Sequence, residues 1–160
     1  MGAHSDKHLL YADWTKRDSL LVSEKDFKKD IERNYKRMQR FGIMKKDAVY
    51  FLPPYEWYNR SIASWTGDLN LILVTFSPGT LSTADYTYPG MKNYQSSEEI
   101  YASIMNYENK SSNGLNGFIL LIHIGTDERR TDKFYLKLDM LVNELTVKGY
   151  TFVRIDELLN

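Results

Sequence analysis

Apolar residues recur every three or four positions in several stretches of the chain, which is the spacing of an amphipathic helix. The clearest stretch is 24–41, which follows the N-cap residue Ser23 and ends before Gly42, a residue type at which helices commonly stop. Its apolar stripe consists of Phe27, Ile31, Tyr35 and Met38. The same spacing predicts further helices over 59–66, 97–107 and 131–148.

Continuous apolar runs between these helices predict buried strands over 48–52, 69–76, 117–124 and 150–155. The run 117–124 is the strongest of them. Strands that alternate with helices imply crossover connections and a mostly parallel sheet, so the expected fold class is α/β. Residues 77–95 show no period and contain two Pro-Gly pairs, and loops of this length are often functional.

Composition narrows the function classes. The 160 residues carry 21 Lys and Arg against 21 Asp and Glu, and this zero net charge argues against a nucleic-acid binder. The chain has no cysteine, which excludes disulfides and thiolate metal sites. No run is long and apolar enough for a membrane span, and no secretory signal is visible. The length and the absence of an interior linker predict one domain over 1–160.

Three features follow predicted strands, where functional residues of α/β folds gather. They are the Pro53-Pro54-Tyr55 segment, the loop after Ser77, and His123 at the end of the strongest strand. A single histidine at a strand end is more often a core or rim residue. His123 alone therefore does not identify a site.

His4 and His8 are spaced so that their rings would lie one helical turn apart on a common face. Two neutral imidazoles suit a divalent metal, but a catalytic metal normally has three protein ligands. The alternative is a disordered terminus with two incidental histidines.

The combination of these features is more specific than each part. Residues 4–8, His-Ser-Asp-Lys-His, resemble the His-(Ser/Thr)-x-x-His metal motif of the NodB-type polysaccharide deacetylases, carbohydrate esterase family four. Residues 51–55 resemble that family's Arg-Pro-Pro-Tyr wall segment, and residues 119–123 resemble its Leu-x-Leu-His motif. The tail 131–159 resembles its last helix, strand and leucine-rich end.

The resemblance implies a partial, distorted (β/α) barrel and hydrolysis of acetyl groups on polysaccharides, with acetylated polysaccharide as the partner. It also implies a divalent metal, usually zinc, held by His4 and His8, with His123 as general acid and Tyr55 at the oxyanion. Pro54 would line the substrate groove. The family usually acts outside the cytoplasm.

Some family features are not matched. The family's Asp-Asp motif lies before the histidine pair, and here only three residues precede His4, so we expect a domain that lacks its first βα unit. Leu52 stands where the family often has Arg. Asp85-Tyr86 is a stand-in for the family's Asp-Trp, with Asp85 pairing with His123 to raise its basicity, or else Asp85 is a solvated loop carboxylate.

The aromatic residues allow two interpretations. Trp57 and Tyr86 could stack on sugar rings, or they could pack at the rim and hold the long loop down. Trp65 is expected in the core. The charged run 127–130 is expected to be an exposed turn without a catalytic role.

Two functions remain open from the sequence. The first is a metal-dependent deacetylase domain with little activity as an isolated chain, since the base and the third metal ligand are absent. The second is a non-catalytic carbohydrate-binding or interaction module on the same fold. An incomplete barrel would expose a strand edge, so we also expect self-association into a homo-oligomer.

Overall fold

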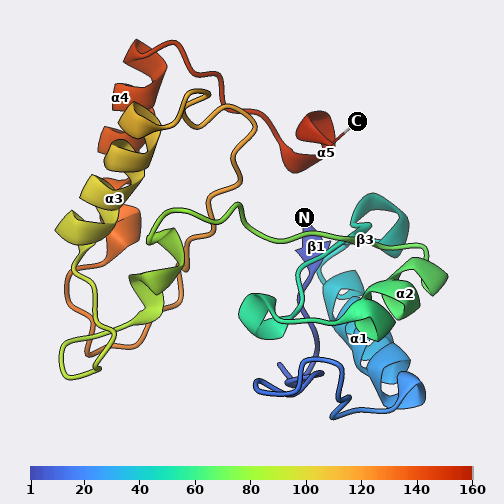
Figure 1. Cartoon of the computed structure of the whole chain (residues 1–160). Coiled ribbons are helices and arrows are strands. Elements are labelled where there is room, and N and C mark those ends of the chain that lie inside the picture. The colour runs from blue at the N-terminus through green and yellow to red at the C-terminus, as the bar shows by residue number, and fades with distance from the viewer. Residues whose placement is uncertain (160) are drawn as a thin grey trace. The chain divides into compact units, whose positions relative to one another are not determined.

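The computed structural model describes residues 1–159 and divides into two compact units, Met1–Thr75 and Phe76–Asn160 (Figure 1). Each unit has its own hydrophobic core, and each is described by itself below. The single domain expected from the sequence stays a prediction. Within the described residues no helix is long and apolar enough to cross a membrane.

A small parallel sheet lies at the centre of the first unit. Its strands β1 (Gly2–Ala3), β2 (Tyr50–Phe51) and β3 (Ile72–Leu73) are ordered β1-β2-β3, with Ala3 opposite Phe51 and Phe51 opposite Leu73. The parallel pairing confirms the α/β class. Over the described residues the sheet is three strands wide and does not close, which agrees with the partial barrel expected from the sequence.

Two helices supply the apolar side chains that bury the sheet. Helix α1 (Glu24–Gln39) begins after Ser23, whose hydroxyl accepts a hydrogen bond from the Asp26 N–H, and α2 (Arg60–Asp68) begins after Asn59. Both predicted helices are therefore confirmed to within a few residues. Their buried side chains pack with those of the strands in one core, which includes Ala3, Phe27, Ile31, Phe51 and Ile62.

The second unit is built on helix pairing without a sheet among its described residues. Helices α3 (Ser97–Lys110) and α4 (Leu138–Val147) pack through Ile100, Ile104, Leu141 and Leu145, and lie side by side in Figure 1. A short helix, α5 (Ile155–Leu158), follows near the end of the chain. Helix α3 starts with a capping box, in which Ser96 and Glu99 each satisfy the other's backbone N–H.

Two strand predictions are wrong in this unit. Residues 117–124 and 150–155 are not in strands. In the first segment the backbone bonds are made to other partners: the Ile119 N–H donates to the Ser77 hydroxyl, and the His123 N–H donates to Asp85. A strand requires a neighbour whose backbone pairs in register, and an apolar sequence alone does not provide one.

The last long helix begins later than predicted. A 3₁₀ turn, Phe134–Lys137, precedes α4, and residues 131–133 before it are not helical. Asp132 in that segment accepts hydrogen bonds from the Ser97 N–H and the Tyr94 hydroxyl, so its side chain is used for tertiary contacts. The expected start at residue 131 is therefore wrong. The long loop 77–95 contains one 3₁₀ turn, Ser82–Tyr86, which carries Asp85.

Candidate functional site

The first group of predicted site residues lies where β1 and β2 end. His4 directly follows β1, and the Pro53-Pro54-Tyr55 segment follows β2 after Leu52. The strands are parallel, so their carboxyl ends meet at one edge of the sheet and bring these segments together. The backbone N–H of Leu52 donates to the Ala3 carbonyl, which extends the pairing of β1 and β2 up to this edge.

His4 and His8 are neighbours, but on a bent loop and not on a helical turn. Ser5 and His8 have φ of 89° and 53°, in the left-handed region, and the Ser5 hydroxyl accepts a hydrogen bond of 2.9 Å from the His8 N–H. The two imidazole centroids lie 5.0 Å apart. The expectation of helical geometry is therefore wrong, whereas the proximity of the two rings is observed.

One buried carboxylate holds this loop in place. Asp30 of α1 is only 4% exposed and accepts hydrogen bonds from the Ser5 hydroxyl, the Lys7 N–H and the Tyr11 hydroxyl at 2.5, 3.1 and 2.8 Å, with a longer one of 3.3 Å from the Asp6 N–H. Burial raises the pKa of Tyr11 far above its usual range, so its hydroxyl keeps the proton that it donates. The loop is thus anchored to the helix behind it.

The sequence carries a signal for the burial of Asp30. Asp30 lies three positions after Phe27 and next to Ile31, on the apolar stripe of α1. A carboxylate on a buried helix face needs several donors, which here come from the loop 5–11.

The Nδ1 atom of His4 lies 2.8 Å from the carbonyl oxygen of Leu52. A carbonyl can only accept, so this contact places the proton of the neutral ring on Nδ1 and leaves the Nε2 lone pair for a ligand. Metal-bound histidines in proteins are commonly oriented by this kind of second contact. The Leu52 side chain takes no part in it.

The donor set near His4 and His8 fits part of a zinc site. Two imidazoles are suitable ligands for a divalent ion, but over residues 1–159 no group of three or more His, Asp or Glu side chains could hold a metal. The nearest sequence neighbour with a carboxylate, Asp6, is ion-paired with Arg37. The described residues therefore supply two ligands and not the third.

The wall segment forms a tight turn at the same edge. Pro53 and Pro54 are buried, and Tyr55 and Glu56 follow with φ of 60° and 53°. A left-handed conformation is uncommon for residues other than glycine, and strained turns of this kind cluster at functional sites. The turn presents the half-exposed Tyr55 ring to His8, with ring centroids 4.6 Å apart. The substrate-contact roles of Pro54 and Tyr55 stay predictions.

The second group of predicted residues lies in the second unit. Asp85 is fully buried, and its two carboxylate oxygens contact Nδ1 and the backbone N–H of His123, both at 2.6 Å. The contact predicted between these two residues is thus observed. Tyr86 lies edge-on to the His123 ring at 5.9 Å and is 47% exposed. The His123 side chain is 35% exposed, so solvent reaches the ring that Asp85 holds.

This pair has the geometry of a proton-transfer group. A buried carboxylate on Nδ1 fixes the ring orientation and stabilises the imidazolium form, while Nε2 is directed away from the carboxylate. The same arrangement orients the histidine of hydrolases that use a general acid or base. Its role in this protein stays a prediction.

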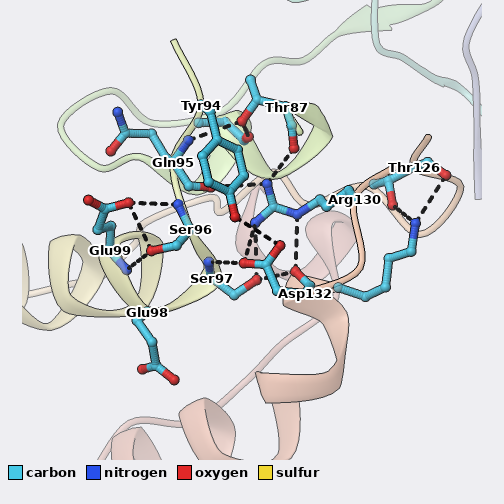
Figure 2. Close-up of polar contacts among 12 residues, drawn as sticks. Thr87, Tyr94, Gln95, Ser96, Ser97, Glu98, Glu99, Thr126, Arg130 and Asp132 are labelled. Carbon is cyan, nitrogen blue, oxygen red and sulfur yellow. Dashed lines mark hydrogen bonds and ion pairs between the residues drawn. The ribbon is translucent and has the colours of Figure 1, made fainter. Parts of the chain in front are cut away.

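A buried arginine, which sequence reasoning missed, connects the loop of Asp85 to the segment after His123 (Figure 2). The Arg130 guanidinium donates to the carbonyls of Thr87 and Gln95 at 2.5 and 3.0 Å, and to the Ser97 hydroxyl at 3.0 Å. Its Nε atom donates to the Asp132 carbonyl at 3.1 Å. Thr87 is two residues from Asp85, and Arg130 is seven from His123, so this cluster joins the two segments that carry the pair.

The expectation that the run 127–130 is an exposed turn is therefore wrong for Arg130, which is 0% exposed. The expectation is correct for the neighbouring Arg129, which is exposed and pairs with Asp127. Nothing in the sequence distinguishes the two arginines, because the difference depends on loop carbonyls far away along the chain.

No protein-family model and no curated protein sequence matches this chain. Solved structures do match. One is BA3943, a CE4 family pseudoenzyme from Bacillus anthracis, with a TM-score of 0.68 at 18% identity over 99% of this chain and 46% of that one. A mutant of it with restored enzymatic activity matches with a TM-score of 0.69, at 18% identity, over 99% of this chain and 47% of the mutant.

Another match is the Bc1960 peptidoglycan N-acetylglucosamine deacetylase, with a TM-score of 0.69 at 20% identity over 97% of this chain and 60% of that one. The chain has the fold of the CE4 polysaccharide deacetylases. This agrees with the resemblance found in the sequence. The chain spans about half the length of the solved CE4 structures that it matches.

We expect Asp30→Ala to lower the free energy of unfolding by about 2–4 kcal/mol, because four donors lose their buried acceptor. Urea denaturation followed by circular dichroism measures this. Glu32→Ala, at an exposed position of the same helix, is the matched control and should change the value by less than about 0.5 kcal/mol. Equal stability of the two variants would contradict the anchoring role of Asp30.

We expect Arg130→Met to destabilise the protein by about 3–5 kcal/mol, because buried carbonyls and Asp132 lose a charged partner. Arg129→Met removes a neighbouring guanidinium that is exposed, and should cost no more than about 1 kcal/mol. Thermal unfolding of both variants gives the comparison. A loss that is the same for the two would show that the Arg130 contacts contribute little.

Proposed function

We propose that this protein takes part in metal-dependent removal of acetyl groups from an acetylated polysaccharide, with His123 as the proton donor. The observation that carries the proposal is the double contact of buried Asp85 with His123. A buried carboxylate is costly, and here both of its oxygens orient one partly exposed imidazole. The CE4 fold of the chain supports the reaction class.

His4 and His8 would hold the divalent ion. The third ligand would be a group that the described residues do not place beside these two histidines. When bound, such an ion would polarise the acetyl carbonyl and make water more acidic. The chain's own residues prepare this by orientation: the Leu52 carbonyl fixes His4, and Ser5 with Asp30 fixes the loop that carries His8. Zinc is the ion that the family resemblance favours.

In the proposed reaction, water adds to the acetyl carbonyl carbon and loses a proton to the solvent, and the bond from that carbon to the sugar nitrogen or oxygen breaks. The leaving group needs a proton, which His123 supplies from Nε2 while Asp85 stabilises its charged form. The released products are acetate and the free amine or hydroxyl of the sugar. Tyr86 and Tyr55 are placed beside His123 and His8 respectively, where they can contact the sugar.

Bc1960, a structure with the same fold, is a peptidoglycan N-acetylglucosamine deacetylase. We therefore propose peptidoglycan or a related N-acetylated polymer as the substrate to test first. An extracytoplasmic location agrees with that substrate and stays a prediction, as does the self-association expected from the sequence.

Two observations favour a second candidate, a non-catalytic carbohydrate-binding module. The described residues supply only two ligands of a metal site. In addition, one CE4 protein of the same fold is a pseudoenzyme. Acetate release separates the two candidates, because a binding module retains the polysaccharide and releases no acetate.

We expect the zinc-loaded chain to release acetate from N-acetylated peptidoglycan only slowly, because it supplies two metal ligands and not the third. His123→Ala should reduce that low rate about 100-fold or more. Asp85→Asn keeps the shape but removes the charge, so it should reduce the rate at least about tenfold. Glu128→Gln, in the exposed turn after His123, is the control and should leave the rate unchanged. A coupled enzymatic acetate assay measures the rates.

Proton NMR gives a second measurement that does not depend on turnover. The Nδ1 proton of His123 should resonate far downfield in the unaltered protein and lose that shift in Asp85→Ala. A downfield signal without acetate release from any acetylated polymer would reject the enzymatic proposal in favour of the binding module.

We expect His4→Ala and His8→Ala each to weaken Zn²⁺ binding by at least about tenfold, since each removes one of two nitrogen ligands. Competition with a chromogenic chelator measures the affinity. His123→Ala removes the remaining histidine of the chain and serves as the control, with no expected change. Loss of affinity in the control alone would place the metal elsewhere and reject the assignment of His4 and His8.

A further inference from the structure

A large aromatic ring stands beside the proposed metal ligands and has no assigned role. The Trp14 side chain is 53% exposed, and its indole lies 5.7 Å from the Tyr55 ring and 5.3 Å from the Trp57 ring. Tyr55 in turn contacts His8 at 4.6 Å. The Trp14 ring is therefore within about 10 Å of the His8 ring, the sum of two ring contacts.

The loop that carries Trp14 is ordered by specific contacts. The Asp13 carboxylate accepts from the Thr15 N–H, the Thr15 hydroxyl and the Lys16 N–H at 2.7–2.8 Å. These hydrogen bonds, that from Lys16 above all, hold the pKa of Asp13 below its usual range. The Asp13 backbone pairs with Ser19 across the loop.

The same loop is joined to the segment after the wall turn. The Trp57 indole N–H donates to the Asp13 carbonyl at 3.2 Å, and Asn59 donates to the Arg17 carbonyl at 3.0 Å. The Arg17 guanidinium lies 4.2 Å from the Trp57 ring centroid and covers one face of that ring. These contacts cover part of the Trp57 ring and fix the loop that carries Trp14.

Exposing an indole to water is unfavourable, because a tryptophan buries a large apolar area when it finds a partner. Single exposed apolar residues are common and need no explanation. Trp14 differs in two respects. Its ring lies next to the Tyr55 ring, which is 46% exposed, so the two form one exposed aromatic surface. The hydrogen bonds of its loop also fix the position of Trp14. A fixed aromatic surface of this kind is a preformed site for a flat, largely apolar ligand face.

We propose that Trp14 forms a sugar-stacking subsite beside the His4–His8 loop, which binds a pyranose ring of a β-linked polymer that contains N-acetylglucosamine. The ligand class rests on the proposed function. A pyranose with equatorial substituents presents C–H groups on its two faces and hydroxyls around its edge, so an indole can cover one face while the hydroxyls stay in water. The subsite would bind the sugar next to the one that carries the reacting acetyl group.

The test is isothermal titration of the folded chain with tetra-N-acetylchitotetraose. We expect Trp14→Ala to weaken binding about tenfold, and Trp14→Phe to recover part of the loss because it keeps a smaller ring. Phe41→Ala is the matched control: Phe41 is 82% exposed in the same unit, and its truncation should leave the affinity unchanged. Thermal unfolding should show the same midpoint for Trp14→Ala and the unaltered protein.

Equal affinity of Trp14→Ala and Phe41→Ala would overturn the subsite, and so would a lack of oligosaccharide binding by the unaltered protein. The titration is repeated in the His123→Ala background, where Trp14→Ala should weaken binding by the same factor. If Trp14-dependent binding is present but neither the unaltered protein nor any variant releases acetate, the subsite stands and the proposed deacetylation is rejected.

Discussion

The loops of this protein depend on one constraint: a charge that is buried must be surrounded by hydrogen-bond partners. Asp30, Asp85 and Arg130 are each at most 4% exposed, and each takes its partners from loop backbone or loop side chains. A buried ion without such partners would cost several kcal/mol. The loops therefore adopt the conformations that satisfy these three groups, and the groups replace the regular ladders that short strands cannot provide.

This constraint explains how two-residue strands can support a site. Strands β1 and β2 fix only where His4 and Pro53 leave the sheet. Beyond that edge the chain is held by Asp30 on one side and by the turn at Tyr55 on the other. Each of these contacts removes alternative conformations of the loops, and so restricts the positions of the residues that the loops carry.

The parts of the fold that follow from local sequence were predictable. The stripe of Phe27 and Ile31, the cap at Ser23 and the motif order located α1, the wall turn and the histidines. The strands over 117–124 and 150–155 were not, because a strand depends on a partner segment and apolar composition says nothing of that partner. The burial of Arg130 depends on carbonyls at 87 and 95, more than thirty residues away, and no local pattern encodes it.

The buried pair in the second unit bears on the choice between enzyme and binding module. A carboxylate at 0% exposure carries a desolvation cost that an apolar residue of similar size at position 85 would avoid, and in a binding module its benefit would be limited to ordering the loop around it. Asp85 is of use where the His123 ring must carry a proton in a fixed orientation, because the carboxylate compensates the charge that the ring acquires. The Trp14, Tyr55 and Trp57 cluster serves either function, since stacking requires no proton transfer. The cost of keeping Asp85 buried is therefore the stronger argument for catalysis, and the aromatic cluster is an argument for the sugar alone.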